Sequence, residues 1–283
     1  MKTIFITGAS SGFGKLTIPL LLDAGHAVIA GIRGGDERLR EVFPQHGREI
    51  GVRLFAVDLH MDRFETFESA TRLVQERFEG KLDVLINNAG LGLFGALEDQ
   101  DPAQFRQFFD VNFFGQVFLT KAMLPMLRAA RGRVLMISSV AGLLSFPMYG
   151  SYSASKFAIE AMYESLWYEM RPFGVQVCLI EPGAFRTSFN TAKSIALGAE
   201  NPTSMYHLRS QKLDHFQRFS TKRQGDPQVV ARLIARYCEK SRIPLRRPVG
   251  LDCWVMSILG RVLPGAIRTR VEYFVFRKIV FKD

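Results

Sequence analysis

The sequence lacks the features that mark secreted, membrane-spanning and metal-binding proteins. Its three cysteines, Cys178, Cys238 and Cys253, are odd in number and show no CxxC spacing, so they indicate reduced thiols rather than a disulfide framework. No charged and then apolar leader precedes the first apolar run, and no run approaches the roughly 20 apolar residues of a membrane span. The five histidines have no metal-ligand spacing, so we expect no metal site. These absences favour a cytoplasmic protein.

Negative charge is scarce near the C-terminus. Residues 218–283 hold 15 Lys or Arg against 5 Asp or Glu, and the formal charge of the whole chain is +10, so the rest of the chain is balanced. The basic surplus indicates either an acidic partner, such as anionic lipid, nucleic acid or a charged cofactor, or a solvated basic face. We expect no nucleic acid, because no basic groove with spaced stacking aromatics is evident.

Strand-like and helix-like segments alternate along the first two thirds of the chain. The predicted strands are 3–8, 26–33, 52–59, 82–90, 132–139 and 175–183, and the predicted helices are 15–25, 36–43, 65–80, 102–130 and 152–173. This alternation predicts an α/β fold, a single-domain, Rossmann-type doubly wound parallel sheet with helices on both faces. We assign residues 1–283 to this one domain. Within it, we expect about 184–283 to supply substrate loops and a C-terminal extension.

A glycine-rich turn joins the first strand to the first helix. The run TGASSGFG places Gly8, Gly12 and Gly14 there, with a spacing that differs from the usual GxGxxG. Glycine lets the backbone turn tightly and approach a ligand, and the helix N-terminus offers free N–H groups to an anion. The turn therefore predicts a site for the pyrophosphate of a dinucleotide.

The end of the second strand indicates which dinucleotide is bound. NAD sites offer a carboxylate to the ribose about 20 residues past the glycine turn, whereas Arg33 stands there in this chain. Arginine favours a 2′-phosphate, so we expect NADP(H) rather than NAD(H). Asp36 is the rival, although it lies past two glycines at the start of a predicted helix, where capping is its expected role.

A tyrosine and a lysine are spaced for proton transfer. Tyr152 and Lys156 are four residues apart in a predicted helix, so they share one face. A nearby ammonium stabilises phenolate, which predicts a lowered pKa for Tyr152. Tyr149 precedes Gly150 and lies outside this helix. Ser139 ends the strand 132–139, where its hydroxyl can hold a substrate oxygen.

With these motifs in this order, the chain resembles the short-chain dehydrogenase/reductase family. The matching pieces, which cover roughly residues 1–190, are TGASSGFG at 7–14, NNAG at 87–90, VN at 111–112, ISSVAG at 137–142, YSASK at 152–156 and EPG at 181–183. The stretch 140–170 is most similar to the 17β-hydroxysteroid and retinol dehydrogenase branch. One departure is Ser11, because many NADP-dependent members carry a basic residue there. Here Lys15 follows Gly14 instead, so the NADP(H) preference depends on Arg33 and Ser10.

The resemblance implies four catalytic residues. Tyr152 would be the general acid in carbonyl reduction and the general base in alcohol oxidation. Lys156 would lower its pKa and bind the nicotinamide ribose, Ser139 would polarise the carbonyl, and Asn112 would hold a water in a proton relay. Two alternatives stay open: Asn112 could bond helix backbone, and Ser138 could be the serine that faces the substrate.

The resemblance also implies cofactor contacts. Asp58 would bind the adenine, 88–90 the adenine ribose, and Pro182 and Gly183 with Thr187 the nicotinamide amide. The full set of expected cofactor-binding residues is Gly8, Ser10, Ser11, Gly12, Phe13, Gly14, Arg33, Asp58, Leu59, Asn88, Ala89, Gly90, Tyr152, Lys156, Pro182, Gly183 and Thr187.

The segments expected beside the substrate, which are 90–98, 145–150 and the part after Phe185, are apolar. Their apolar residues are Leu91, Leu93, Phe94, Leu144, Phe146, Met148, Phe185 and Phe189. They favour a lipophilic carbonyl or alcohol, such as a steroid, retinoid, fatty aldehyde or aromatic ketone, although each residue could instead serve core packing.

Three further questions concern activity, membranes and assembly. A catalytically silent NADP(H)-binding sensor or scaffold is the alternative function, which the intact set of four catalytic residues disfavours. Residues 268–281, RTRVEYFVFRKIVF, could contact a membrane surface, which we do not favour, or form a strand or helix that closes the site or a subunit interface. The family resemblance implies a homodimer or homotetramer formed through the helices that hold Asn112 and Tyr152.

Overall fold

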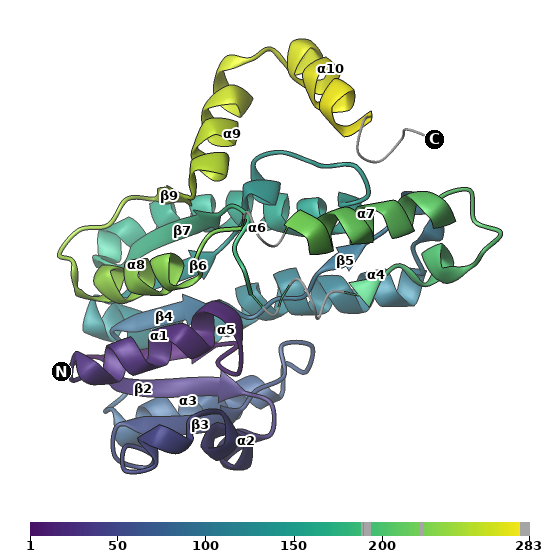
Figure 1. The fold of residues 1–283 in the computed structure, drawn as a ribbon. Helices are drawn as coiled ribbons and strands as arrows, with labels where there is room; N and C mark the ends of the chain where they lie inside the picture. The colour runs from purple at the N-terminus through teal and green to yellow at the C-terminus, as the bar shows by residue number, and fades with distance from the viewer. Residues whose placement is uncertain (188, 190–193, 221–223, 278–283) are drawn as a thin grey trace.

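A seven-stranded parallel sheet forms the centre of the molecule (Figure 1). The computed structural model describes residues 1–187, 189, 194–220 and 224–277. The strands are β1 (Thr3–Thr7), β2 (Ala27–Ile32), β3 (Leu54–Asp58), β4 (Val84–Asn87), β6 (Arg133–Ile137), β7 (Gln176–Pro182) and β9 (Arg246–Val249). Their order is β3-β2-β1-β4-β6-β7-β9, with every pairing parallel. The predicted doubly wound fold is confirmed, and β9 adds a strand that the sequence pattern did not predict.

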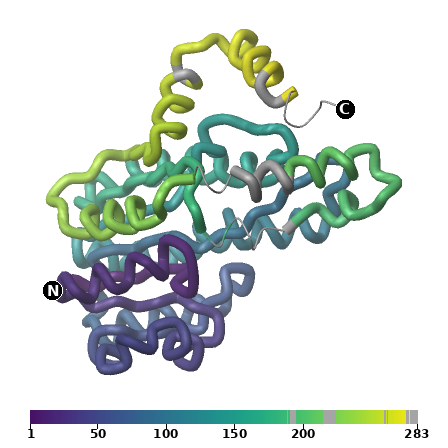
Figure 2. The backbone as a smooth tube through the Cα atoms, in the orientation of Figure 1, coloured from purple at the N-terminus to yellow at the C-terminus, as the bar shows by residue number. Residues whose placement is uncertain are grey.

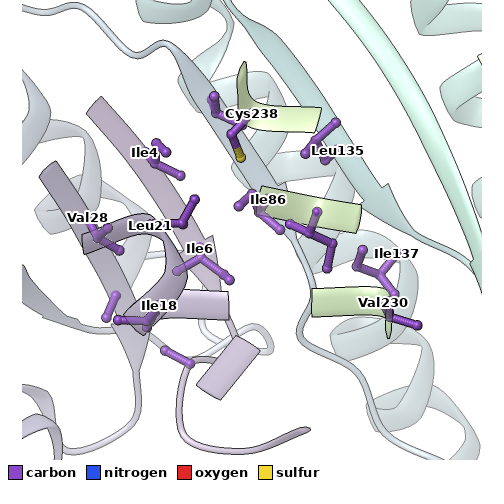
Figure 3. Packing of buried hydrophobic residues seen from close by; sticks show 14 of the residues in the cluster. Ile4, Ile6, Ile18, Leu21, Val28, Ile86, Leu135, Ile137, Val230 and Cys238 are labelled. Carbon is purple, nitrogen blue, oxygen red and sulfur yellow. The ribbon is translucent and has the colours of Figure 1, made fainter. Parts of the chain in front are cut away.

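Helices cover both faces of the sheet. On one face lie α1 (Gly12–Asp23), α2 (Gly35–Val42) and α8 (Gln228–Glu239), and on the other lie α3 (Thr66–Arg77), α5 (Gly115–Ala130) and α6 (Gly150–Met170). Strand residues alternate between the two cores. Ile4 and Ile6 of β1 pack with α1 (Figure 3), whereas Phe5 packs on the opposite face. Burial on both faces explains why the strands are continuous apolar runs.

The predicted helix 102–130 consists of three joined segments. These are α4 (Pro102–Phe109), a π-helical turn (Asp110–Phe114) and α5, which contains Pro125. Asp101 caps α4 by accepting from the backbone N–H groups of Ala103 and Gln104. The π-helical turn carries Asn112, and such turns are frequent at functional sites.

Beyond Gly183, the chain has more regular structure than its sequence pattern indicated. The elements there are β8 (Ser194–Ile195), which pairs with β5 (Leu93–Phe94), α7 (His207–Ser220), α8, β9, α9 (Leu251–Val262) and α10 (Gly265–Phe276). Short 3-10 helices lie at Pro44–His46, Leu97–Asp99, Val140–Gly142, Arg171–Phe173 and Leu197–Glu200.

The segment 268–281 is helical where it is described. The helix α10 includes it up to Phe276, so the strand alternative is wrong for that part, and 278–281 lie outside the described residues. The pair α9 and α10 projects beyond the edge of the sheet (Figures 1 and 2). In the described part of the chain, no helix has the length and apolarity to cross a membrane.

Candidate active site

A cavity of about 600 Å³ lies at the carboxyl ends of the parallel strands. Its walls include residues that follow β1, β2, β4, β6 and β7, together with residues of α6 and α9. Ligands of open α/β sheets bind at this edge, because the loops that leave the strands meet there. The fold therefore brings most of the predicted site residues into one cavity.

The glycine turn after β1 is packed so closely that side chains would not fit. Gly8 and Gly12 have positive φ values of 66° and 53°, which favour glycine. A Cβ on Gly8 would lie 2.8 Å from Ala89 Cα, and one on Gly14 would collide with the carbonyl oxygen of Gly8. Asn88 fixes the turn by donating from Nδ2 to the carbonyl oxygens of Thr7 (3.0 Å) and Gly8 (3.2 Å).

The start of α1 can receive an anion. Ser11 is the N-cap residue of α1 and makes no side-chain capping bond among the residues that the structure describes. Thr187 approaches the turn, with its Cβ 3.7 Å from the position that a Cβ on Gly12 would take. The N–H groups at a helix start bind phosphate, so this cradle fits the pyrophosphate of a dinucleotide.

Among the expected adenosine contacts, Arg33 and Leu59 line the cavity, and Asp58 does not. The Oδ1 atom of Asp58 accepts from the backbone N–H of Gly34 at 2.8 Å and lies 3.3 Å from His60 Nε2. Asp58 thus supports the turn that carries Arg33. The rival Asp36 lies in the first turn of α2 and does not line the cavity.

Tyr152 lies in the apolar part of the cavity, within α6. Its ring centroid is 6.0 Å from that of Phe94 and 5.5 Å from that of Phe189, and its side chain is hydrogen-bonded to Ser139. Burial raises the pKa of Tyr152 to about 12, and the Ser139 bond opposes that rise. The predicted lowering of this pKa is therefore wrong for the structure as it stands, because desolvation of the phenol outweighs the other effects.

Lys156 is buried one helical turn after Tyr152. Its ammonium donates to the carbonyl oxygen of Ile137 at 2.9 Å and lies 5.8 Å from the centroid of the Tyr152 ring. Burial lowers the pKa of Lys156 to about 8, and the nearby Glu160 carboxylate opposes this fall. The lysine is thus poised to lose or keep its proton near physiological pH.

Ser139 and Ser138 have different surroundings. Ser139 Oγ accepts from the backbone N–H of Ala141 at 3.1 Å and bonds with Tyr152. Ser138 Oγ is buried near Glu160 and has no hydrogen-bond partner among the described residues. The geometry favours Ser139 as the serine beside the tyrosine, although both serines line the cavity.

Asn112 does not line the cavity. It is 1% exposed within the π-helical turn, where its Oδ1 accepts from the Leu91 N–H at 2.8 Å and its Nδ2 donates to the Leu91 carbonyl at 2.9 Å. These bonds use the backbone of the loop after β4 rather than helix backbone, the alternative that the sequence left open. Asn112 therefore holds Leu91 in place at the cavity wall.

A buried cluster of charges behind Lys156 was not predicted. Arg246 of β9 lies 3.1 Å from Glu160, 2.8 Å from Glu164 and 3.6 Å from Glu181, which is fully buried. The i, i+4 spacing of Lys156, Glu160 and Glu164 puts these three residues on one face of α6 and was readable from the sequence. The arginine could not be located, because only the fold brings β9 beside β7.

Five of the eight predicted substrate residues line the cavity, namely Leu91, Phe94, Phe146, Phe185 and Phe189. The other three are packing residues: Leu93 belongs to β5, Leu144 contacts α9 near Gly260, and Met148 packs on Leu213.

The cavity also includes Tyr149, which lies in a segment expected beside the substrate, and two residues of α9 that the sequence did not indicate. Tyr149, the N-cap residue of α6, lies 4.4 Å from Phe94 between ring centroids. Asp252 and Met256 of α9 line the cavity, and Asp252 Oδ2 accepts from the Ala184 N–H at 2.7 Å. In the described ranges, no group of three His, Cys, Asp or Glu residues could hold a metal ion.

Comparisons with known proteins agree with this geometry. The model of the short chain dehydrogenase family matches residues 2–197. A 3-ketodihydrosphingosine reductase from Bacteroides thetaiotaomicron is 36% identical over 253 residues, which cover 88% of each chain. Human retinol dehydrogenase 8 is 34% identical over 273 residues, covering 92% of this chain and 85% of that protein. A solved short-chain dehydrogenase from Streptomyces avermitilis is 33% identical, with a TM-score of 0.80 and coverage of 98% and 96%.

Proposed function

The chain belongs to the short-chain dehydrogenase/reductase family, and from this premise we propose that it interconverts a carbonyl and an alcohol on an apolar small molecule with NADP(H). The family membership makes it an oxidoreductase that acts on alcohols or carbonyls with NAD or NADP. The preference for NADP(H), the apolar substrate and the residue roles are the proposed parts.

The observation that carries the proposal is the hydrogen-bonded pair Tyr152 and Ser139 in the apolar part of the cavity. With a pKa of about 12, Tyr152 is a protonated phenol at neutral pH, the form that can give a proton to a carbonyl oxygen. Ser139 would donate a hydrogen bond to the same oxygen. Bound NADPH would supply the hydride for the carbonyl carbon, so the products would be an alcohol, NADP⁺ and a tyrosinate that solvent reprotonates.

Lys156 would support the charge that this step leaves on Tyr152. The ammonium lies 5.8 Å from the centroid of the phenol ring, and it would favour the tyrosinate electrostatically. Alcohol oxidation needs Tyr152 as a base, so it requires loss of a proton whose pKa is about 12. We therefore propose that alcohol oxidation accelerates as pH rises.

The position of Arg33 supports NADP(H) over NAD(H). Arg33 lines the cavity together with Gly31 and Leu59, whereas Asp36 and Asp58 lie outside the lining. A 2′-phosphate at Arg33 would meet a cation, and the carboxylates that do line the cavity are those of Asp62 and Asp252. Ser10 and Ser11 line the same part of the cavity and would contribute hydroxyl donors.

The rings around Tyr152 support a substrate with an extended apolar part. Phe94, Phe146 and Phe189 surround the phenol, and the cavity continues to Leu213 and Met256. The names of two relatives refer to 3-ketodihydrosphingosine and to retinol, which both have long apolar parts. We propose a long-chain or polycyclic ketone or aldehyde as the substrate class.

The test is NADPH oxidation with a series of unbranched ketones of increasing chain length. We expect kcat/KM to rise with each added methylene, by up to about fourfold per group, because each one buries apolar surface. A flat series, or faster turnover with short polar ketones, would contradict an apolar substrate.

We also propose that two copies pair through α5 and α6. The outer faces of these helices expose Phe114, Phe118, Phe157 and Met162, each about 40% accessible in one copy. Static light scattering tests this pairing: we expect the mass of a dimer or tetramer, and a monomer at all concentrations would contradict it.

A further inference from the structure

The helices α9 and α10 carry their apolar residues on the outside. In α9, Cys253 and Ser257 are buried and Gly260 lies against Leu144, so three small residues of the helix face the body of the protein. The outer face exposes Leu251 (77%), Trp254 (56%) and Val262 (72%). An ordinary surface helix has the opposite arrangement, with its large apolar residues facing the core.

The exposed residues of α9 form one stripe. Leu251, Trp254, Val255, Ile258 and Val262 follow spacings of three and four residues, which put them on a single face of a helix. All five are at least 40% accessible. Such a continuous apolar face on a soluble domain marks an interaction surface.

The second helix repeats this pattern and adds positive charge. Ile267, Val271 and Phe274 of α10 are exposed at i, i+4 and i+7. On a helical wheel, Arg270 and Arg277 fall beside this stripe, and both are exposed. The stripe of α10 is therefore bordered by cations.

We propose that α9 and α10, which we call the C-terminal hairpin, lie in the surface of an anionic membrane with both stripes in the lipid. This reverses the expectation drawn from the sequence of 268–281, because the fold leaves the apolar stripes exposed. The inference extends beyond the redox function and does not depend on it.

Three features favour a membrane over a second copy of this chain. Arg270 and Arg277 complement anionic headgroups, whereas a symmetric pairing of two α10 stripes would bring like charges together. Trp254 and Tyr273 are exposed on the hairpin, and both residue types favour the boundary between lipid and water. The outer faces of α5 and α6 offer a separate apolar surface to a second copy.

The length of the two helices also favours binding within the membrane surface. Each helix has 12 residues, so each is about 18 Å long, too short to cross an apolar layer of about 30 Å. Helices of this kind bind within the interface, with the apolar face buried among the acyl chains. The hairpin projects from the body, so it can reach a flat surface (Figure 1).

Membrane binding would place the cavity next to the bilayer. The inner side of α9 contributes Asp252 and Met256 to the cavity wall, and its outer side carries the stripe. The same helix would thus touch both the lipid and the space where an apolar molecule binds.

The experiment uses tryptophan fluorescence in the full chain. The sequence contains two tryptophans, so Trp167→Phe leaves Trp254 as the reporter. Vesicles of phosphatidylglycerol and phosphatidylcholine are titrated into this variant, with pure phosphatidylcholine vesicles as comparison. We expect the Trp254 emission to shift to shorter wavelength with the anionic vesicles, and the affinity to fall as salt rises.

Two valines of similar exposure provide a matched pair of variants. Val262→Asp, placed in the reporter background, puts a carboxylate in the α9 stripe and is expected to weaken vesicle affinity about tenfold or more. Val52→Asp changes a 68% exposed valine before β3 and should leave the affinity unchanged. Both variants should retain NADPH oxidation with a soluble ketone, since neither residue lines the cavity, so loss of membrane binding is distinguishable from loss of function.

Two results would overturn the inference. One is an unchanged Trp254 emission with anionic vesicles at low salt. The other is a blue shift that occurs without vesicles as protein concentration rises, together with a larger mass that Val262→Asp abolishes, since this outcome would assign the stripe to a second copy.

Discussion

Residues 1–183 and residues 184–277 use their apolar side chains in different ways. In the first region, strand residues such as Ile4 and Val28 are fully buried, and the turns around the cavity are fixed by backbone partners, as with Asn88 and Asn112. In the second region, α8 and β9 complete the sheet and its cover, but α9 and α10 expose large apolar residues such as Leu251. In the proposed function, the first region would hold the cofactor and the proton donor, and the second region would shape access to them.

The largest effect is expected when the proposed proton donor, Tyr152, loses its hydroxyl. Tyr152→Phe keeps the ring and removes the hydroxyl, so we expect kcat to fall by about 10²–10⁴-fold. NADPH affinity, measured by fluorescence titration, should stay within about twofold, because the glycine turn and Arg33 are untouched. Tyr149→Phe is the control and should retain most activity; the reverse ranking of the two variants would place the acid at Tyr149.

The choice between NADPH and NADH tests the part of the cavity that contains Arg33. Arg33→Asp replaces the expected phosphate partner with a carboxylate, so we expect the ratio of kcat/KM for NADPH over NADH to fall about tenfold to a hundredfold or more. The effect should appear mainly in KM, since the contact is remote from the reacting atoms. Asp36→Asn is the control, and a change in the ratio there with none in Arg33→Asp would make Asp36 the ribose contact.

The charge cluster should set the alkaline limit of reduction. Glu160 raises the pKa of Lys156 against the lowering by burial, so Glu160→Gln should lower that pKa below about 8. The ammonium would then be lost at lower pH, and the alkaline fall in kcat should move to lower pH by up to about one unit. Glu164→Gln also removes a partner of Arg246 but does not act on Lys156, so its pH profile should match the wild type. Identical pH profiles of kcat for both variants would show that Glu160 does not set the alkaline limit of reduction.

The smallest effect is expected in the second region. Met256→Ala enlarges the cavity from α9, so KM for a long-chain ketone should rise about threefold to tenfold while kcat and NADPH affinity stay nearly unchanged. Ile258→Ala changes the outer face of the same helix and should leave all three parameters unchanged with a soluble substrate. A fall in kcat for Met256→Ala would mean that α9 takes part in the chemistry, which would contradict the different roles given to residues 1–183 and 184–277.

The sequence predicted the first region well because its signals are local. Alternating apolar strands, a glycine turn and the Tyr152–Lys156 spacing each lie within a few neighbouring residues. The strand β9 was missed because its sequence, RRPV, begins with two arginines and contains a proline. It becomes a strand through its pairing with β7 and the contacts of Arg246 with Glu160 and Glu164.

Other features could not be predicted, since they depend on burial. The sequence gives the i, i+4 spacing of Tyr152 and Lys156. It does not give the burial that raises the pKa of Tyr152 and lowers the pKa of Lys156. Likewise, the apolar residues of α9 have normal amphipathic spacing, and only the fold reveals that the large ones face outward. The resemblance to the dehydrogenase family and its retinol branch is confirmed by the relatives, whereas the role of each site residue stays a prediction.

The most direct test of the central claim is isotope transfer. Wild-type protein is mixed with NADPH that carries deuterium at the transferable position of the nicotinamide ring and with a long-chain ketone, and the alcohol is analysed by mass spectrometry. Hydride transfer in this cavity predicts an alcohol with one deuterium on the carbinol carbon, formed in equal amount to the NADPH consumed. NADPH binding without alcohol formation from any apolar ketone or aldehyde, or an alcohol without deuterium, would contradict the claim.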